Sequence, residues 1–246
     1  MEKLYIVIPA YNEQDTIKKV IDDWYPVVEQ IGGESRLVIV NDGSSDRTEE
    51  ILAGCAESHE RLVGLTKENG GHGAAVLYGY QYALDAGAEY IFQTDSDGQT
   101  VSVEFWDFWE QRGAYDMVIG HRVKREDGFS RIVVTKVLKL VLLMLFHVRI
   151  PDANTPFRLM KADTLAQYLP LIPPGYHLSN VIISVIYKKK KLAVKYMPIT
   201  FRPRQGGVNS INMKKIIQIG RQAWKDFRTI NRVIAGSTGD IDGVKG

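Results

Sequence analysis

Residues 90–99 read Tyr90-Ile91-Phe92-Gln93-Thr94-Asp95-Ser96-Asp97-Gly98-Gln99, an apolar run followed at once by an acidic cluster. The apolar start predicts a buried strand over 90–94. Asp95 and Asp97 lie two positions apart, so their side chains point the same way on an extended chain, and Gln99 continues that alternation. Such oxygen ligands bind Mg²⁺ or Mn²⁺, and phosphate oxygens often complete the shell. The stretch therefore predicts a cation site made of these three residues or, as its alternative, an acidic surface turn.

The first 120 residues repeat this arrangement, because strand-like and helix-like segments alternate along them. We predict strands over 4–8, 37–40, 62–66, 90–94 and 117–119. We predict helices over 13–31, 46–58, 73–86 and 103–112. This order predicts an α/β fold whose mainly parallel sheet is flanked by helices, with ligands bound at the carboxyl ends of the strands.

Other predicted strands also end in polar or Gly-rich clusters. Pro9 stops the first strand, and Tyr11 offers a flat face to a nucleobase. Asp42 ends the second strand, where a carboxylate can bind ribose hydroxyls or the edge of a pyrimidine. The Gly-rich stretch 68–75 opens a helix after the third strand, and its backbone N–H groups suit a phosphate. These positions favour the cation site over the surface turn.

Composition sets the class of protein. The chain has 246 residues, 45% of them hydrophobic and 24% charged, which is typical of a globular protein and not of a disordered or fibrous one. The single cysteine, Cys55, excludes an intramolecular disulfide framework and a multi-cysteine zinc site, and it favours a reducing compartment. The first residues run directly into a strand, so we expect no signal peptide.

The net charge of +2 hides an uneven distribution. Residues 1–120 contain 8 Lys/Arg and 22 Asp/Glu, whereas residues 121–246 contain 23 Lys/Arg and 7 Asp/Glu. The basic half predicts an anionic partner such as phosphate, lipid headgroups or nucleic acid. No helix-turn-helix, zinc-finger or RNA-binding motif accompanies the charge, so we expect no nucleic-acid partner.

The longest apolar stretch, 132–146, contains Lys136 and Lys139 as its only charges. Fifteen residues are too few to span a bilayer, which needs about 20. The segment predicts either a helix lying in the membrane surface, with its lysines among the headgroups, or a buried core helix. Basic residues on both sides favour peripheral contact at the membrane, with Leu142 on the apolar face.

The pattern of elements changes after residue 120. We predict a loop over 151–156, a helix over 178–187, a strand over 192–201 and a helix over 213–233. The chain shows no repeat and no low-complexity linker. We therefore expect one domain over 1–235 and a flexible tail over 236–246.

Together these motifs resemble family 2 glycosyltransferases of the GT-A fold. The resemblance rests on Ile8–Glu13, Val40–Thr48, Asn69–Gly79 and the cluster Asp95-x-Asp97-x-Gln99. Gly120-His121-Arg122, Asp152…Phe157-Arg158 and Phe201–Gly207 resemble the dolichyl-phosphate mannosyltransferase-like branch. The resemblance spans roughly residues 4–230. It implies an inverting glycosyltransferase that uses a UDP- or GDP-sugar and Mg²⁺ or Mn²⁺, with a C-terminal extension on the acceptor side. Within the domain 1–235 it implies a nucleotide-sugar-binding half (1–120) and an acceptor- and membrane-facing half (121–235).

The resemblance also implies roles for individual residues. The nucleotide would contact Pro9, Tyr11, Glu13, Asp42, Asn69, Gly70 and Asp95. The metal would be held by Asp95, Asp97 and Gln99, and Asp97 and Asp152 are the catalytic candidates. The acceptor phosphate would face Arg122, Arg131, Arg202 and Arg204.

The chain departs from the family pattern at three places, and the third, the missing carboxylate at 176–180, weakens the case for a hydroxyl acceptor. His72 stands where lysine is common, no glycine directly precedes Phe157-Arg158, and residues 176–180 contain no carboxylate. A hydroxyl acceptor needs a base, whereas a phosphate monoester is already an anion at neutral pH and is bound well by arginine. We therefore expect transfer to a polyprenyl phosphate at the cytoplasmic face of the membrane.

Two alternatives stay open. One is transfer to a hydroxyl of a lipid-linked glycan or cell-surface polysaccharide, with Asp152 as the base. The other is a catalytically silent nucleotide-binding subunit, against which the complete Asp95, Asp97 and Gln99 set argues. A homo-oligomer or a membrane-protein partner is compatible with either reading.

Overall fold

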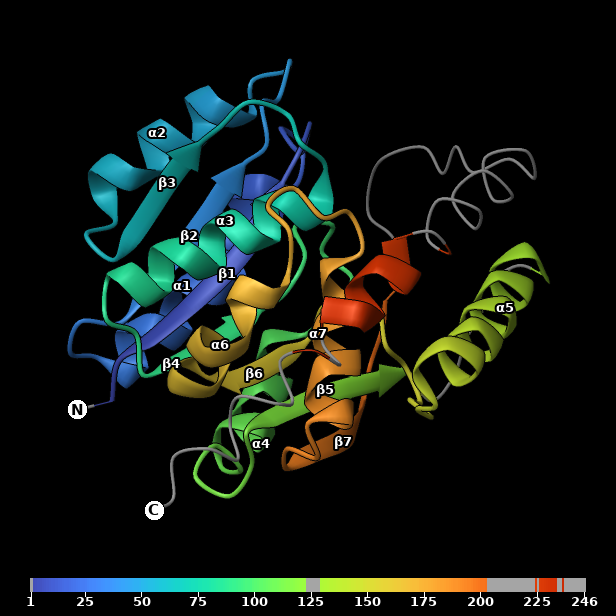
Figure 1. The fold of residues 1–246 in the computed structure, drawn as a ribbon. Coiled ribbons are helices and arrows are strands. Elements are labelled where there is room, and N and C mark those ends of the chain that lie inside the picture. The colour runs from blue at the N-terminus through green and yellow to red at the C-terminus, as the bar shows by residue number, and fades with distance from the viewer. Residues whose placement is uncertain (1, 123–128, 203–223, 225, 234–235, 237–246) are drawn as a thin grey trace.

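The computed structural model of the chain describes residues 2–122, 129–202, 224, 226–233 and 236, with the backbone alone over 129–134. Its centre is a seven-stranded sheet in the order β3-β2-β1-β4-β6-β5-β7 (Figure 1). The strands are β1 (Leu4–Ala10), β2 (Arg36–Asn41), β3 (Leu62–Thr66), β4 (Tyr90–Gln93), β5 (Met117–Arg122), β6 (Arg158–Lys161) and β7 (Val194–Ile199).

The sheet is mainly parallel, as the alternation of strands and helices predicts. β1 pairs in parallel with β2 and β4, β2 with β3, and β5 with β7. β6 runs antiparallel to both of its neighbours, β4 and β5. Because β6 and β7 come from the second half of the sequence, one sheet joins the two halves.

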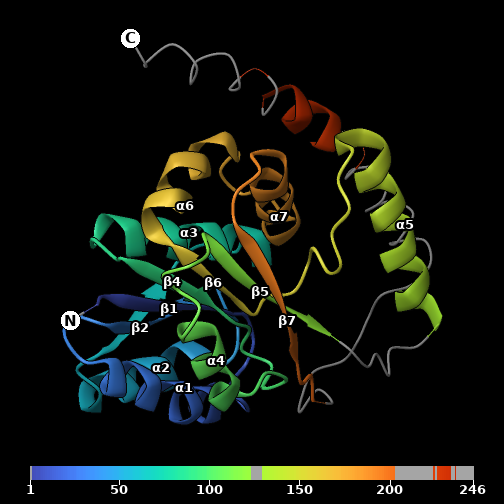
Figure 2. The ribbon, with the colours of Figure 1, turned by 90° about the horizontal axis from the view of Figure 1, so that it is seen from below.

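Helices cover both faces of the sheet (Figure 2). One face packs against α1 (Ile17–Ile31), α2 (Thr48–Ser58) and α4 (Phe105–Trp109), and the other against α3 (His72–Asp85), α6 (Ala162–Tyr168) and α7 (Ser179–Lys189). Alternate residues of β1 divide between the two cores: Ile6 and Ile8 face the first set of helices, and Val7 faces the second. This double burial explains why the central strands β1, β2 and β4 are mostly apolar.

Aromatic packing fixes the exit of β4, which carries the acidic cluster. The ring of Phe92 lies 4.7 Å from that of Phe157, 5.0 Å from Phe105 and 5.3 Å from Trp24, measured between centroids. Rings in tilted or edge-to-face contact at these distances stabilise each other beyond their area burial. The end of β4 therefore leaves the sheet at a rigid point.

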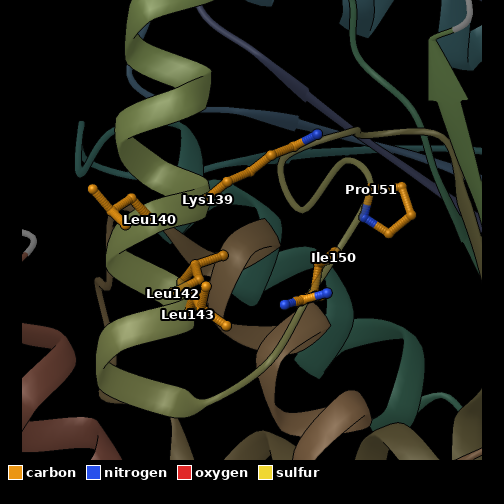
Figure 3. Close-up of a pocket in the computed structure, with 7 residues that line it drawn as sticks. Lys139, Leu140, Leu142, Leu143, Ile150 and Pro151 are labelled. Atoms are coloured by element: carbon orange, nitrogen blue, oxygen red, sulfur yellow. The ribbon is translucent and has the colours of Figure 1, made fainter.

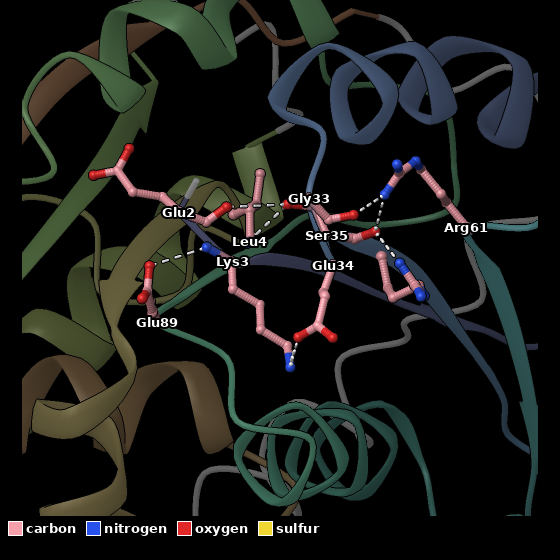
Figure 4. Close-up of polar contacts among 9 residues, drawn as sticks. Glu2, Lys3, Leu4, Gly33, Glu34, Ser35, Arg61 and Glu89 are labelled. Carbon is pink, nitrogen blue, oxygen red and sulfur yellow. Dashed lines mark hydrogen bonds and ion pairs between the residues drawn. The ribbon is translucent and has the colours of Figure 1, made fainter.

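Polar contacts tie together the opposite edge of the sheet, where the strands begin (Figure 4). The Lys3 N–H donates to Glu89, and its ammonium pairs with Glu34 at 2.7 Å. The Leu4 N–H donates to the Ser35 hydroxyl at 3.1 Å. Arg61 donates to the carbonyl oxygens of Gly33 and Ser35. These contacts hold the amino ends of β1 and β2, and the loops at the carboxyl ends carry the predicted site.

The structure corrects several predicted boundaries. The helix predicted over 103–112 is a short 3₁₀ turn, Ser102–Glu104, followed by α4. β6 and α6 were not predicted, because β6 is four residues long and carries the charged Arg158 and Lys161 at its ends. Most of the helix predicted over 213–233 and the tail over 236–246 lie outside the described residues, although 226–233 is helical.

The apolar segment 132–146 lies within helix α5 (Phe129–Phe146), which stands at the outer edge of the molecule in Figure 2, away from α1, α2 and α4. Leu142 and Phe146 are buried, and the Phe146 ring contacts Phe227 at 5.6 Å between centroids. Another face of α5 is exposed, with Leu140 at 53% and Met144 at 49% of full exposure. The helix thus has both a core face and an exposed apolar face, and Leu142 belongs to the core. None of the helices among the described residues has the length and hydropathy needed to cross a bilayer.

Candidate active site

A cavity of about 450 Å³ opens at the carboxyl ends of β1, β2 and β4. The loops after these strands bring together seven of the residues predicted from sequence: Pro9, Tyr11, Glu13, Asp42, Asn69, Asp95 and Asp97. The wall is completed by Ala10, Gly71, His72, Ala75 and Ser96. The cavity therefore combines a half-exposed aromatic ring, carboxylates and the start of α3.

Both carboxylate oxygens of Asp42 accept hydrogen bonds within the cavity. One carboxylate oxygen accepts hydrogen bonds from the Lys67 ammonium at 2.7 Å and the Gly70 N–H at 3.0 Å, and the other accepts from the Gly71 N–H at 2.7 Å. Burial by itself raises the pKa of Asp42, but Lys67 and these N–H groups outweigh it and lower that pKa below its ordinary value. Asp42 thus fastens the Gly-rich turn to the end of β2.

Gly70, predicted to contact the nucleotide, takes part through this backbone bond and is not among the residues described as lining the cavity. Gly43 turns the chain sharply next to Asp42, with φ +66°. A Cβ there would lie 2.8 Å from the Asn69 backbone nitrogen, so only glycine fits. The close approach sets the position of Asn69, whose side chain donates to the Asp42 carbonyl at 3.0 Å.

The loop after β1 is cross-linked to the loop after β2. Asn12, at φ 54°, donates its N–H to the Ser44 hydroxyl at 2.9 Å and accepts from the Ser45 N–H at 2.8 Å. The Glu13 N–H donates to the Thr48 hydroxyl, and the Glu13 carboxylate accepts from Thr16 at 2.6 Å. These bonds fix the segment that presents Tyr11 to the cavity.

Asp95 and Asp97 both line the cavity, as their alternate spacing predicts. The His72 ring nitrogen Nε2 lies 2.9 Å from Asp95 Oδ1. Desolvation alone lowers the pKa of His72, but the Asp95 carboxylate raises it above the ordinary value. Asp97 accepts the Gln99 N–H at 3.1 Å across a turn at Gly98, where φ is +69°.

The two carboxylates form a pair and not a closed metal cage. Within the described residues there is no group of three or more His, Cys, Asp or Glu side chains placed to hold a metal ion. Two hard oxygen ligands beside an open cavity fit a cation such as Mg²⁺ or Mn²⁺ that takes further ligands from a diphosphate. Gln99 is not among the residues described as lining the cavity, and its amide nitrogen donates to the Arg202 carbonyl at 2.8 Å.

The predicted acceptor-side residues behave differently from the predicted nucleotide residues. Arg122 forms a two-pronged ion pair with Asp152, at 3.0 and 3.4 Å, and its guanidinium lies over the Phe201 ring at 4.9 Å. Both partners of this pair are largely buried. Arg202 is exposed, whereas the Arg131 side chain and all of Arg204 lie outside the described residues.

Arg158 is fully buried in the structure. No functional role was predicted for it from the sequence. Its guanidinium donates to the carbonyl oxygens of Ala153, Thr155 and Asn180, which joins the loop holding Asp152 to α7. Burial lowers the pKa of Arg158, yet a guanidinium keeps its charge in a protein. The sequence signal for this residue is its place in the Phe157-Arg158 pair, which contributes to the family resemblance without a role assigned to Arg158.

Comparison with known protein families identifies the family to which this chain belongs. Residues 5–168, more than half of the chain, match the family described as Glycosyl transferase family 2. The chain belongs to glycosyl transferase family 2. The family predicted from the motifs is thereby confirmed.

Curated relatives of this family 2 protein carry names of lipid-phosphate sugar transferases. An undecaprenyl-phosphate 4-deoxy-4-formamido-L-arabinose transferase of Pectobacterium carotovorum is 28% identical over 145 residues, which cover 58% of this chain and 43% of that protein. A dolichyl-phosphate beta-glucosyltransferase of Trichomonas vaginalis is 29% identical over 211 residues, covering 78% and 62%. The chain spans 43 to 64% of the length of the first four curated relatives.

The fold of this family 2 protein matches solved structures over nearly its whole length. Glucosyl-3-phosphoglycerate synthase from Mycobacterium tuberculosis, crystallised with Mn²⁺ and UDP-glucose, superposes with a TM-score of 0.66 at 18% identity. The match covers 93% of this chain and 79% of that one. It confirms the predicted GT-A arrangement of a mainly parallel sheet flanked by helices.

Proposed function

We propose that this family 2 protein is an inverting glycosyltransferase that moves a sugar from a UDP- or GDP-sugar to a polyprenyl phosphate. The observation that supports the proposal is a single cavity lined by Asp95, Asp97 and Tyr11. The Gly-rich turn that donates to Asp42 forms another part of its wall. An aromatic face, hydrogen-bonding carboxylates and a helix start are what a nucleoside diphosphate requires. The names of the relatives support a lipid-phosphate acceptor.

The donor half prepares the sugar–diphosphate bond for cleavage. Asp95 and Asp97 would hold Mg²⁺ or Mn²⁺, which supplies Lewis-acid stabilisation of the departing diphosphate. The start of α3, at Gly71 and His72, lines the same cavity, and the positive end of the helix dipole there would favour the negatively charged diphosphate. Attack by an acceptor oxygen on the anomeric carbon, opposite the breaking bond, inverts that carbon.

The acceptor half supports a phosphate more than a hydroxyl. A base must be available to take a proton, but Asp152 is engaged by the Arg122 fork in a largely buried ion pair. An arginine opposite a carboxylate favours its ionised form and makes it a weaker base. A phosphate monoester needs no such base, because it is already an anion near neutral pH. The pairing of Arg122 with Asp152 therefore argues against a hydroxyl acceptor that relies on Asp152 as its base.

A second cavity supports a lipid acceptor. It has a volume of about 520 Å³ and lies between α5 and the segment that leads to Asp152 (Figure 3). Its wall is apolar apart from two cations, and consists of Lys139, Leu140, Leu142, Leu143, Arg149, Ile150 and Pro151. Apolar walls with basic groups suit a hydrocarbon chain with an anionic head. Because Pro151 directly precedes Asp152, the cavity adjoins the acceptor side of the site.

The exposed face of α5 supports peripheral contact with the cytoplasmic face of a membrane, where such a lipid resides. Val137, Leu140, Leu143 and Met144 are exposed on α5, and Lys136 and Lys139 are exposed on the same helix. An apolar face with lysines beside it is typical of a helix that lies in the headgroup region.

The direct test is transfer of radiolabelled sugar from a panel of UDP- and GDP-sugars to undecaprenyl phosphate and dolichyl phosphate with Mn²⁺ present. We expect a lipid-extractable product that mild acid hydrolyses, because a glycosyl phosphate is acid-labile. An acid-stable product would support transfer to a hydroxyl. No metal-dependent product and no nucleotide binding with any donor would refute the proposal.

Membrane contact can be tested with the double variant Leu140→Glu/Met144→Glu. Each substitution removes an apolar side chain whose burial in the membrane would be worth roughly 1.5–3 kcal/mol, and it adds a carboxylate. We therefore expect binding to phosphatidylglycerol vesicles to fall by about 100-fold. Melting temperature should stay near that of the native protein, since both residues are exposed. Val103→Glu, at an apolar position 69% exposed on another element, is the matched control. Unchanged vesicle binding by the double variant would rule out α5 as the contact.

A further inference from the structure

Gln99 lies in the loop after β4 and forms a hydrogen bond with Arg202, which is 103 residues later in the chain. Its side-chain nitrogen donates to the Arg202 carbonyl at 2.8 Å. In return, the Arg202 N–H donates to the Gln99 carbonyl, also at 2.8 Å. The two residues therefore share one side-chain and one backbone hydrogen bond, which fixes the direction of the chain at Arg202.

The same short segment is held at two further points. The Thr200 N–H donates to both carboxylate oxygens of Glu104 at 3.0 Å. The Phe201 ring lies under the Arg122 guanidinium, which is paired with Asp152. Contacts thus run continuously from Asp97, which accepts the Gln99 N–H, to the acceptor-side arginines.

The choice of an amide at position 99 agrees with this contact better than with metal binding alone. Divalent cations such as Mg²⁺ and Mn²⁺ bind oxygen ligands, and at position 99 a carboxylate would be a stronger ligand than an amide. Only an amide also offers an N–H₂ group that can donate to the Arg202 carbonyl. Glutamate at this position would keep the oxygen ligands, lose the donor and place negative charge against a carbonyl oxygen.

We propose that the Gln99 amide nitrogen is a positioning group that holds the segment 200–202 in place for the acceptor phosphate, separately from any metal contact of its oxygen. The inference rests on the proposed function, because the segment carries Arg202. Through this contact, a change in the metal-binding loop is transmitted to the acceptor side. Gln99 does not need to touch either substrate to do so.

The test compares Gln99→Glu, which keeps oxygen ligands, with Gln99→Met, which removes the donor without adding charge. We expect both variants to raise the KM for undecaprenyl phosphate at least tenfold. We expect Gln99→Glu to raise the donor KM less than threefold and not to weaken Mn²⁺ binding, because the variant keeps oxygen ligands. Gln30→Glu, on the exposed end of α1, controls for added charge and should behave as the native protein.

Three results would overturn the proposal. One is a KM for undecaprenyl phosphate within twofold of native in Gln99→Glu. Another is a rise in that KM in Gln99→Glu but not in Gln99→Met, which would attribute the rise to the added charge. The third is a parallel loss of Mn²⁺ affinity in Gln99→Glu.

Hydrogen exchange separates this proposal from the proposed function, because it needs no acceptor. Peptides covering 199–202 should exchange at least tenfold faster in both Gln99 variants than in the native protein, since the bonds at Arg202 are weakened. If exchange rises in this way but native protein transfers no sugar to polyprenyl phosphate, the proposed function fails and the positioning contact stands. Unchanged exchange would refute the contact whatever the acceptor is.

Discussion

Replacement of Asp97 by alanine is expected to lower kcat/KM for sugar transfer by about 1,000-fold or more and to leave the fold intact. Asp97 and Asp95 line one cavity and are the oxygen ligands that would hold the proposed divalent cation. Stabilising charge on a leaving diphosphate is worth several kcal/mol, and each 1.36 kcal/mol is a factor of ten in rate. Steady-state kinetics over a range of Mn²⁺ concentrations measures the loss directly.

The matched control for this variant is Asp107→Ala, which removes the same charge from an exposed position on α4. We expect native activity from it. A second measurement distinguishes metal binding from general damage: Mn²⁺ should raise the melting temperature of native protein in the presence of UDP or GDP and should not do so for Asp97→Ala. If Asp97→Ala keeps a tenth of native activity or more, the Asp95 and Asp97 pair is not required for sugar transfer.

The residues of the candidate site could be predicted from sequence because parallel strands place their carboxyl ends at one edge. Asp42 and Asp95 are 53 positions apart, yet each follows an apolar run, and β2 and β4 both pair with β1. Burial on both faces makes such runs recognisable. The local pattern was thus sufficient to bring the acids together in one cavity.

The partners of those residues could not be predicted in the same way. The contacts of Lys67 with Asp42, Arg158 with the 153–155 carbonyls and Gln99 with Arg202 depend on where side chains meet in three dimensions. The antiparallel β6 is also invisible to periodicity, because four residues are too few to show it. Arg122 and Asp152 were predicted as separate functional groups, and only the fold shows that they neutralise each other.

Gly73→Ala is expected to destabilise the protein although alanine is the better helix former. Gly73 is the second residue of α3, and a Cβ there would lie 2.2 Å from the Tyr176 carbonyl oxygen and 2.5 Å from that of His177. Backbone atoms cannot rotate away as a side-chain tip can. Helix propensity favours alanine by about 1 kcal/mol at most, whereas overpacking costs about 1–3 kcal/mol or more. The steric cost therefore prevails.

The matched control is Gly54→Ala, the same substitution inside α2, where a Cβ would meet nothing within 4 Å. We expect Gly54→Ala to stabilise the protein by about 0.5–1 kcal/mol and Gly73→Ala to lower the melting temperature by roughly 4–8 °C. Because Gly73 follows His72 at the cavity wall, donor affinity should fall in Gly73→Ala and stay native in Gly54→Ala. Equal stability of the two variants would show that α3 and the segment just before α7, which contains Tyr176 and His177, are not in contact in solution.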